Sequence, residues 1–212
     1  MKNNIIGRKS EQDTLARIYE SRQSEFVAVC GRRRVGKTFL VREYFEQEMV
    51  FQTSGLAGGN TQEQLKNFFY TLRRYDRNVT SVPHDWLDAF EMLISYLDSL
   101  NGIERKVIFL DELPWMDTAG SNFISALEHF WNGWASARRD IVLIVCGSAT
   151  SWMMDKLINN HGGLYGRLTH RLFLQPFSLG ESEAFLKTKG MMLSRYELAE
   201  LYMILGEIGR AH

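Results

Sequence analysis

The stretch of sequence that most constrains the fold is residues 25–40, an apolar run followed by a glycine-rich loop. The loop reads GRRRVGKT, with Lys37 and Thr38 directly after Gly36 and with Gly31 at its start. This is the spacing G-x-x-x-x-G-K-[ST], in which glycines let backbone N–H groups turn inward around a phosphate. The helical pattern that follows would point its positive end at the same anion. The stretch therefore predicts a strand, a phosphate-binding loop and a helix, in that order.

The sequence predicts specific roles for two side chains of this loop and less specific ones for the others. We expect Lys37 to neutralise the β- and γ-phosphates of a nucleotide and Thr38 to offer its hydroxyl to Mg²⁺. A chance match in a basic turn is disfavoured, because the strand and the helix that the mechanism needs both flank the loop. For the arginines, solvated side chains at the mouth of the loop are a better interpretation than individual catalytic roles. The other predicted nucleotide contacts here are Arg32, Arg33, Arg34, Val35 and Phe39.

A second apolar run ends in a pair of acidic residues. The segment KVIFLDELPW places Asp111 and Glu112 at the carboxyl end of a strand, which is where ligands bind in open α/β sheets. Asp111 would hold the Mg²⁺ shell, and Glu112 could orient and deprotonate the attacking water. An acidic pair that merely ends a strand is the alternative, and the upstream phosphate loop disfavours it. A water-activating Glu112 argues for hydrolysis over transfer to another metabolite.

A third apolar run, IVLIVCGSATS, ends in small polar residues. If this strand inserts between the other two, its end lies near the γ-phosphate. Ser148 is then the first candidate to sense that phosphate and position the water, and Thr150 is the second. A helix N-cap is an open alternative for these side chains.

The two cysteines, Cys30 and Cys146, end the first and third of these runs. The inserted-strand arrangement predicts that the two thiols lie close together, at the same end of neighbouring strands. Their sizes suit the core, and we favour that interpretation over a redox role.

Two further segments carry candidate nucleotide contacts. Arg167 and Arg171 stand before and at the start of the last expected strand, where an arginine could reach a γ-phosphate of its own or a neighbouring subunit. Arg167 is the stronger of these two candidates. At the start of the chain, an apolar pair that ends at Ile6 precedes Gly7 and Arg8. These residues could lie over the base of the nucleotide, although an ordinary helix start explains them equally well.

Apolar runs and helical patterns alternate along most of the chain. Continuously apolar strands are typical of a parallel sheet covered by helices on both faces, so we expect a doubly wound α/β domain. After residue 176 only helical patterns follow. The expected strands are 26–30, 50–53, 107–110, 141–146 and 171–174. The expected helices are 37–48, 62–74, 86–100, 123–137, 151–159, 179–189 and 194–205.

The bulk composition narrows the class of protein. The 212 residues include 25 basic and 25 acidic side chains, so no global charge draws the chain to nucleic acid. A local DNA-binding patch stays undecided. Two cysteines are too few for a disulfide scaffold, and no segment has the length of a signal peptide or a membrane span. We therefore expect a cytoplasmic protein that makes no membrane contact.

The combination of segments resembles a known family. IIGRKSE, CGRRRVGKTFL, VIFLDELPW, IVCGSATSWM and GGLYGRLTHRLFLQPFSLGE together are similar to the prokaryotic archaeal-type ATPases, which are AAA+-related STAND ATPases. The resemblance implies a three-layer P-loop NTPase sandwich with strand order 5-1-4-3-2 in residues 1–177. It implies a partial helical lid in residues 178–212. The chain departs from the family in ending GEIGRAH, and we expect a truncated or naturally curtailed product.

Two functions follow as hypotheses. The first is a Mg²⁺-dependent ATPase that hydrolyses ATP slowly and acts as a conformational switch, alone, as a homo-oligomer or with a protein partner. The second is a nucleotide-binding module without hydrolysis that serves as a regulated protein or DNA-associated assembly platform. A kinase is disfavoured because no acceptor pocket is identified, and GTP because no N-K-x-D element is present.

Overall fold

A computed structural model describes residues 5–159 and 162–205 and contains one five-stranded parallel sheet. The strand order is β2-β3-β4-β1-β5, which confirms the predicted order 5-1-4-3-2 read from the other edge. Each strand extends a predicted run by one or two residues. The strands are β1 (Glu25–Gly31), β2 (Met49–Ser54), β3 (Lys106–Asp111), β4 (Ile141–Gly147) and β5 (His170–Leu174).

Helices connect the strands, and most of them lie where their apolar periodicity predicted. The predicted helix 37–48 stops early, because the chain turns at Phe45 to enter β2: the N–H groups of Glu48 and Met49 both donate to the Phe45 carbonyl. No helix within the described ranges is long and apolar enough to cross a bilayer. The helices are α1 (Lys9–Glu20), α2 (Lys37–Tyr44), α3 (Thr61–Tyr75), α4 (Trp86–Ser99), α5 (Leu113–Met116), α6 (Phe123–Gly133), α7 (Thr150–Met153), α8 (Leu179–Thr188) and α9 (Arg195–Leu205), with a 3₁₀ turn at Ala135–Ala137 and a π-helical turn at Met154–Ile158.

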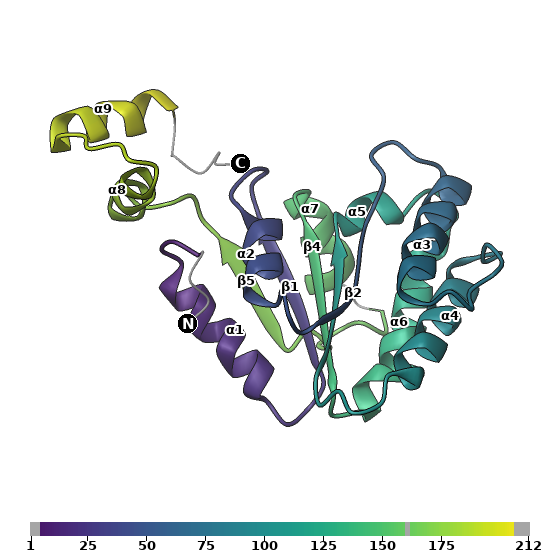
Figure 1. Ribbon diagram of the computed structural model, residues 1–212. Coiled ribbons are helices and arrows are strands. Elements are labelled where there is room, and N and C mark those ends of the chain that lie inside the picture. Colours follow the sequence, from purple (N-terminus) through teal and green to yellow (C-terminus); the bar gives the residue numbers. More distant parts are fainter. Residues whose placement is uncertain (1–4, 160–161, 206–212) are drawn as a thin grey trace.

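The sheet is the middle of three layers (Figure 1). One face, which includes Phe26, Ala28 and Cys30, packs in a large apolar cluster with α3, α4 and α6. The other face, which includes Val27 and Val29, packs with α1 and α2. Because both faces are covered, every residue of β3 and β4 is buried. This burial explains the unbroken apolar runs in the sequence.

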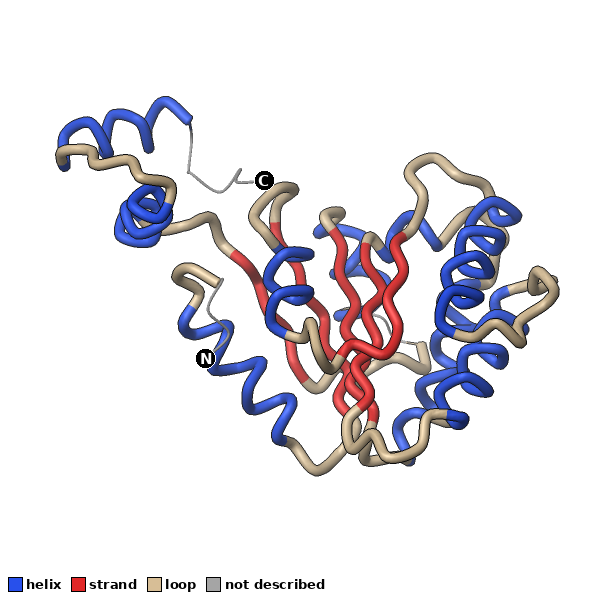
Figure 2. The backbone as a smooth tube through the Cα atoms, viewed as in Figure 1, coloured by secondary structure: helices blue, strands red, loops and turns tan. Residues whose placement is uncertain are grey.

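Helices α8 and α9 form a smaller unit beyond the end of β5. Figure 2 shows the pair set apart from the strands. Its apolar cluster is separate from the two clusters on the sheet. A domain boundary after residue 177, with a helical lid beyond it, stays a prediction. The predicted lid residues 206–212 lie outside the described residues. The cluster contains Leu186 and Leu198, with Phe185, Leu193, Leu201 and Tyr202 packed against them.

The prediction about the two thiols is wrong in one respect. Strands β1 and β4 are neighbours, as expected, but the register pairs Val29 with Cys146 and Cys30 with Gly147. Successive side chains of a strand point to opposite faces, so this offset of one residue sends the thiols to opposite layers. Cys30 packs in one apolar cluster and Cys146 in the other.

Candidate nucleotide-binding site

The loop between β1 and α2 has the backbone geometry that its glycines predicted. Gly31, Arg34 and Gly36 have φ angles of 149°, 69° and 88°. A Cβ atom on Gly31 would lie 2.5 Å from the Leu174 carbonyl oxygen, so only glycine fits between β1 and β5 at this point. Around Gly36 the space is open. The positive φ angles curl the chain into a loop above the start of α2, as a phosphate cradle requires.

Lys37 folds back across this loop. Its side-chain ammonium donates to the carbonyl oxygens of Gly31 and Arg32, at 2.9 Å each, and the residue is 6% exposed. A buried ammonium needs several acceptors, and here backbone carbonyls provide them. The lysine is therefore held at the mouth of the cradle, where a phosphate oxygen could become an additional acceptor.

Thr38 and Asp111 meet, although 73 positions separate them in the sequence. The Thr38 hydroxyl donates to Oδ2 of Asp111 at 2.8 Å, and Asp111 is 5% exposed. A hydroxyl beside a carboxylate is a donor set of hard oxygens, which suits Mg²⁺. Among the described residues no group of three His, Cys, Asp or Glu side chains could hold a metal alone.

Glu112 stands next to this pair in a left-handed backbone conformation. Its φ is 46°, and its N–H donates to Oδ1 of Asp111 at 3.0 Å. One carboxylate oxygen of Glu112 accepts from the Ser148 hydroxyl at 3.0 Å and from the Ser148 N–H at 3.4 Å. Ser148 thus contacts the acidic residue predicted to activate water. Thr150, the second candidate, begins α7, and its side chain lies outside the described residues.

Gly55 contacts this site, and we did not predict it from the sequence. Its N–H donates to the Asp111 carbonyl at 3.0 Å, and a Cβ atom on it would lie 2.7 Å from the Glu112 carbonyl oxygen. The loop after β2 therefore rests directly on the backbone of Glu112. A glycine directly after a strand was the available signal, but only the pairing of β2 with β3 identifies its partner.

The predicted N-terminal contacts lie beside the phosphate loop. Arg8 is 5% exposed, and its guanidinium donates to the Val35 carbonyl at 3.0 Å. Its backbone N–H donates to Glu181 of α8 at 2.7 Å. Ile6 and Gly7 are half-buried next to it. No sequence pattern indicated that Glu181 would contact this turn, since the S-x-x-E pattern of residues 178–181 indicates only a helix start.

The two candidate arginines lie elsewhere. In the register of β5 with β1, Arg171 is opposite Ala28, while Gly31 is opposite Leu174 at the other end of the strand. Arg167 lies two residues before Thr169, whose N–H donates to the Phe26 carbonyl near the amino end of β1 at 2.9 Å. Both arginine side chains are exposed. The structure does not bring Arg167 to the phosphate loop of its own chain, and contact with a neighbouring subunit remains a prediction.

The two cysteines flank the site without chemistry of their own. Burial raises the pKa of the Cys30 thiol to about 11, although Lys37 opposes this effect. Burial and the nearby Asp111 carboxylate also raise the pKa of Cys146 well above its usual value. Both are free thiols. At neutral pH they are protonated and unreactive, in keeping with core residues.

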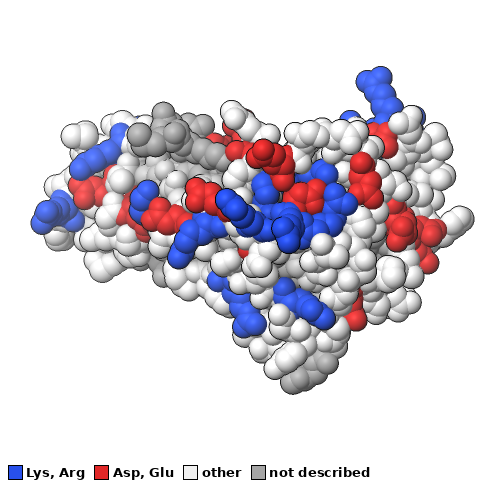
Figure 3. Space-filling model, turned by 90° about the horizontal axis from the view of Figure 1, so that it is seen from below, with Lys and Arg blue, Asp and Glu red and all other residues white. Residues whose placement is uncertain are grey.

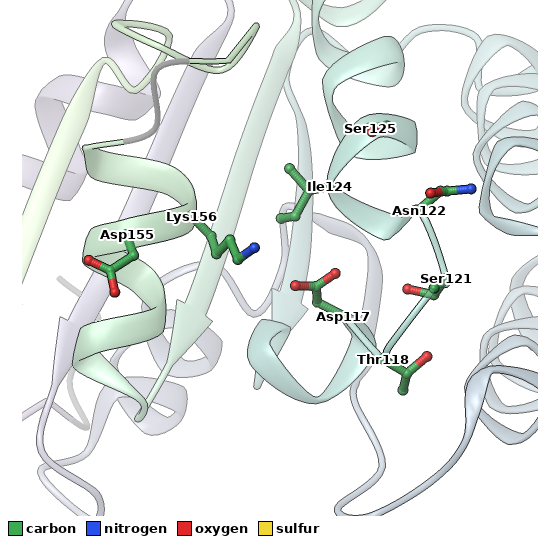
Figure 4. Close-up of a pocket in the computed structure, with 9 residues that line it drawn as sticks. Asp117, Thr118, Ser121, Asn122, Ile124, Ser125, Asp155 and Lys156 are labelled. Carbon is green, nitrogen blue, oxygen red and sulfur yellow. The ribbon is translucent and has the colours of Figure 1, made fainter.

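A separate polar hollow of about 540 Å³ lies beyond α5, the helix that follows Glu112. In Figure 4, Asp117 and Lys156 point toward each other from its two sides, whereas Asp155 points away. The indole N–H of Trp152 donates to Asp117 at 3.0 Å. This contact joins α7, which follows β4, to the segment that follows β3.

The sheet order, the phosphate loop and the side-chain oxygens beside it define a P-loop nucleotide-binding α/β protein. The chain belongs to the family described as an ATPase domain predominantly from Archaea, which matches residues 6–209. Among curated proteins, the uncharacterized MJECL04 of Methanocaldococcus jannaschii is 26% identical over 181 residues. Those residues are 85% of this chain but 38% of the Methanocaldococcus protein.

Solved structures share the fold at low sequence identity. The Walker-type ATPase paby2304 of Pyrococcus abyssi has a TM-score of 0.72 and 19% identity, and the match covers 98% of this chain and 65% of that one. The Aeropyrum pernix ORC2 protein, solved as ADPNP–ADP complexes, has a TM-score of 0.60 and 20% identity, with coverages of 92% and 54%. The chain thus spans less than two thirds of the length of these relatives.

Proposed function

We propose that this protein binds ATP together with Mg²⁺ and hydrolyses it slowly, as a conformational switch. The observation that carries the proposal is the run of hydrogen bonds from Thr38 through Asp111 and Glu112 to Ser148, at 2.8, 3.0 and 3.0 Å. This run lies at the carboxyl ends of β3 and β4, beside the start of α2. Membership of an ATPase family and the nucleotide complexes of the Aeropyrum neighbour support the choice of nucleotide.

Each side chain then has a defined task. Lys37 would donate to the terminal phosphates of ATP, while N–H groups of the loop 31–38 surround them. Thr38 and Asp111 would hold Mg²⁺, which when bound offsets the charge of the phosphates. Glu112 would accept a proton from the attacking water, and Ser148 would orient the Glu112 carboxylate.

The proposed switch follows from the contact of Glu112 with other segments. The loop after β2 rests on its backbone through Gly55, and Ser148 connects it to β4. A change in Glu112 between its ATP-bound and ADP-bound positions would therefore move two segments at once. Slow turnover suits such a device, because the lifetime of the bound state sets its output.

One observation favours the alternative, a module that binds nucleotide without hydrolysing it. The Glu112 carboxylate already accepts from the hydroxyl and the N–H of Ser148, so the oxygen that takes both bonds has fewer lone pairs left for an attacking water. Such a module would act as a platform for a protein or nucleic-acid partner. An oligomer in which Arg167 contacts a neighbour's nucleotide is compatible with both functions. The two free, buried cysteines suit the reducing cytoplasm.

ATP turnover by the purified protein distinguishes the two functions. We expect phosphate release below roughly 1 per second, which is slow for an enzyme, and a fall of about 100-fold or more in Glu112→Gln. Glu112→Gln should still bind ATP with the affinity of the wild type, whereas Lys37→Ala should bind it about 100-fold more weakly. Equal, background-level release from wild type and Glu112→Gln, with ATP bound by both, would establish the non-hydrolysing module.

A further inference from the structure

A short turn near the start of the chain contacts both the phosphate loop and helix α8. The turn is Gly7–Arg8, and it lies between the phosphate loop and helix α8. The guanidinium of Arg8 donates to the Val35 carbonyl of the loop at 3.0 Å. The backbone N–H of the same residue donates to Oε1 of Glu181 at 2.7 Å. One residue therefore contacts the nucleotide cradle with its side chain and α8 with its backbone.

The protein holds the Arg8 side chain in place from several directions. Its guanidinium carbon lies 4.7 Å from the centre of the Phe177 ring, just before α8. Its other terminal nitrogen lies 3.6 Å from Glu11 of α1. With Val35 as a further partner and only 5% exposure, the guanidinium has a fixed position. A buried guanidinium with these contacts positions the loop through the loop's backbone. An exposed arginine would instead be placed to bind an anion.

The backbone of the turn is shaped for the contact with α8. Gly7 and Arg8 have φ angles of 66° and 54°, and the left-handed region costs a residue other than glycine about 1 kcal/mol or more. A Cβ atom on Gly7 would lie 2.6 Å from Oε1 of Glu181. The turn and the carboxylate are therefore in direct contact, and the strained Arg8 conformation presents its N–H to Glu181.

Glu181 uses both carboxylate oxygens. Oε1 accepts from Arg8, and Oε2 accepts from the N–H and the hydroxyl of Ser178 at 2.9 and 3.0 Å, which caps α8. Partial burial alone would raise the pKa of this carboxyl, but the hydrogen bonds from Arg8 and Ser178 hold it below its usual value. Glu181 is thus ionised at neutral pH. The first turn of α8 cannot move away from the turn at Arg8 without breaking a charged hydrogen bond.

We propose that the Gly7–Arg8 turn is a clasp that couples the position of helix α8 to the shape of the phosphate loop. Arg8 is then a positioning residue for the loop, and it acts through the Val35 carbonyl. The inference rests on the proposed function, because the loop must bind nucleotide for the coupling to have an output. Coupling is reciprocal, so nucleotide in the loop would steady α8, and a steady α8 would raise the affinity of the loop.

The two halves of the clasp can be broken separately. Arg8→Ala removes the contacts with Val35 and Phe177 but keeps the backbone N–H that donates a hydrogen bond to Glu181. Glu181→Ala removes the contact with α8 but leaves the guanidinium in place. We expect each variant to bind Mg²⁺–ADP about fivefold more weakly and to lose the slowing of amide hydrogen exchange that ADP causes in residues 179–188. Because the halves act in series, the double variant should bind ADP no more weakly than either single one.

Two control variants separate the clasp from the stability of α8. Ser178→Ala removes part of the cap of α8 and leaves Glu181 bonded to Arg8, so ADP should still slow exchange in α8. Glu183→Ala removes an exposed pair with Lys187 on the same helix and should behave as wild type. Arg8→Lys should restore part of the affinity, since an ammonium can still donate to the Val35 carbonyl.

The outcomes separate failure of the clasp from failure of the proposed function. ADP that binds wild type without slowing exchange in α8 would overturn the clasp and leave nucleotide binding intact. Additive losses of affinity in the double variant would overturn it as well. If wild type bound no nucleotide, the proposed function would fail. Amide hydrogen exchange in loop residues 31–37, measured without nucleotide, would then test the clasp on its own. The clasp requires Glu181→Ala to accelerate this exchange, and an unchanged rate excludes the clasp.

Discussion

The central sheet carries buried charged side chains at both of its strand-end edges, the carboxyl edge and the amino edge. The surroundings of these side chains differ between the two edges. At the carboxyl edge, Lys37 contacts backbone carbonyls of its own loop, and Asp111 accepts from the hydroxyl of Thr38. These are contacts that a phosphate and a cation could extend or replace. Several residues here, including Glu112, have positive φ angles, so the edge holds strained backbone as well as charge.

At the amino edge the charged side chains contact backbone carbonyls and one another. Figure 3 looks onto this face, where Lys and Arg side chains gather at the centre with Asp and Glu beside them. The Arg105 guanidinium donates to the backbone carbonyls of residues 18, 23 and 139 at 2.6–2.9 Å. Asp140 accepts from Lys106 at 2.9 Å and from Arg138 at 2.8 Å. Every one of these contacts stays within the protein.

The difference shows that buried charge by itself does not identify a site. What separates the edges is the backbone beside the charges. At the amino edge the charged residues lie at the ends of regular strands and brace neighbouring segments. At the carboxyl edge Asp111 ends β3 and Lys37 begins α2, beside a loop whose glycines leave space for a ligand, as around Gly36. The comparison predicts that mutations at one edge alter ligand binding and mutations at the other alter stability.

The largest expected effect is on nucleotide affinity. Lys37→Ala should weaken binding of Mg²⁺–ATP by about 100-fold, because hydrogen bonds to charged groups contribute about 1.5–3 kcal/mol. Titration with a fluorescent ATP analogue measures the change. Arg42→Ala, on the exposed side of the same helix, is the control and should bind as wild type does. Full affinity in Lys37→Ala would refute the phosphate-loop assignment.

The next largest effect belongs to the amino edge. Asp140→Ala should lower the free energy of unfolding by about 1–3 kcal/mol, because buried Lys106 loses its acceptor, and should leave ATP affinity unchanged. Urea denaturation measures the loss. Asp98→Ala removes an exposed partner of Arg138 and should cost less than about 1 kcal/mol. A change in ATP affinity in Asp140→Ala would contradict the prediction that the amino edge contributes to stability and not to ligand binding.

This loss should depend on pH in one direction. The hydrogen bond from Arg138, assisted by Lys106, holds the pKa of the Asp140 carboxyl well below its usual range. A lowered folded-state pKa contributes stability that is present above the unfolded-state pKa of about 4 and is lost as the pH falls below it. The stability difference between wild type and Asp140→Ala should stay constant from about pH 5 to 7 and shrink in stronger acid.

A smaller effect tests the role of Ser148 beside Glu112 at the carboxyl edge. Ser148→Ala should slow ATP turnover about tenfold, since one hydrogen bond to a charged group is worth roughly 1.5 kcal/mol. Affinity for ATP should change less than about twofold, because Ser148 contacts Glu112 and not the loop. Steady-state and single-turnover rates separate the two quantities. Faster turnover instead would mean that Ser148 restrains Glu112, as the alternative function supposes.

The smallest effect is expected in the arginine triplet. Arg33→Ala should change ATP affinity less than about threefold, because its side chain is exposed and the loop binds phosphate through backbone N–H groups. The same titration applies. A tenfold loss would show that this side chain reaches the nucleotide and that its interpretation as a solvated residue is wrong.

The sequence by itself determined the strands, the principal helices and the backbone conformation of the phosphate loop. These depend on local rules: apolar runs make buried strands, and Gly31, Gly36, Lys37 and Thr38 stand at the spacing that a phosphate needs. The family resemblance provided the sheet order, and that order brings Asp111 and Glu112 to the same edge. Parallel strands share one carboxyl edge, so residues at strand ends were predictable as neighbours.

Tertiary structure alone decided which side chains touch. A one-residue offset between β1 and β4 sent Cys30 and Cys146 to opposite faces, and no local pattern encodes that register. The contact of Arg8 with Glu181 spans 173 positions, and that of Gly55 with Asp111 joins two strands. Such contacts depend on how whole elements pack, because a side chain's partner is set by the position of the backbone that carries it.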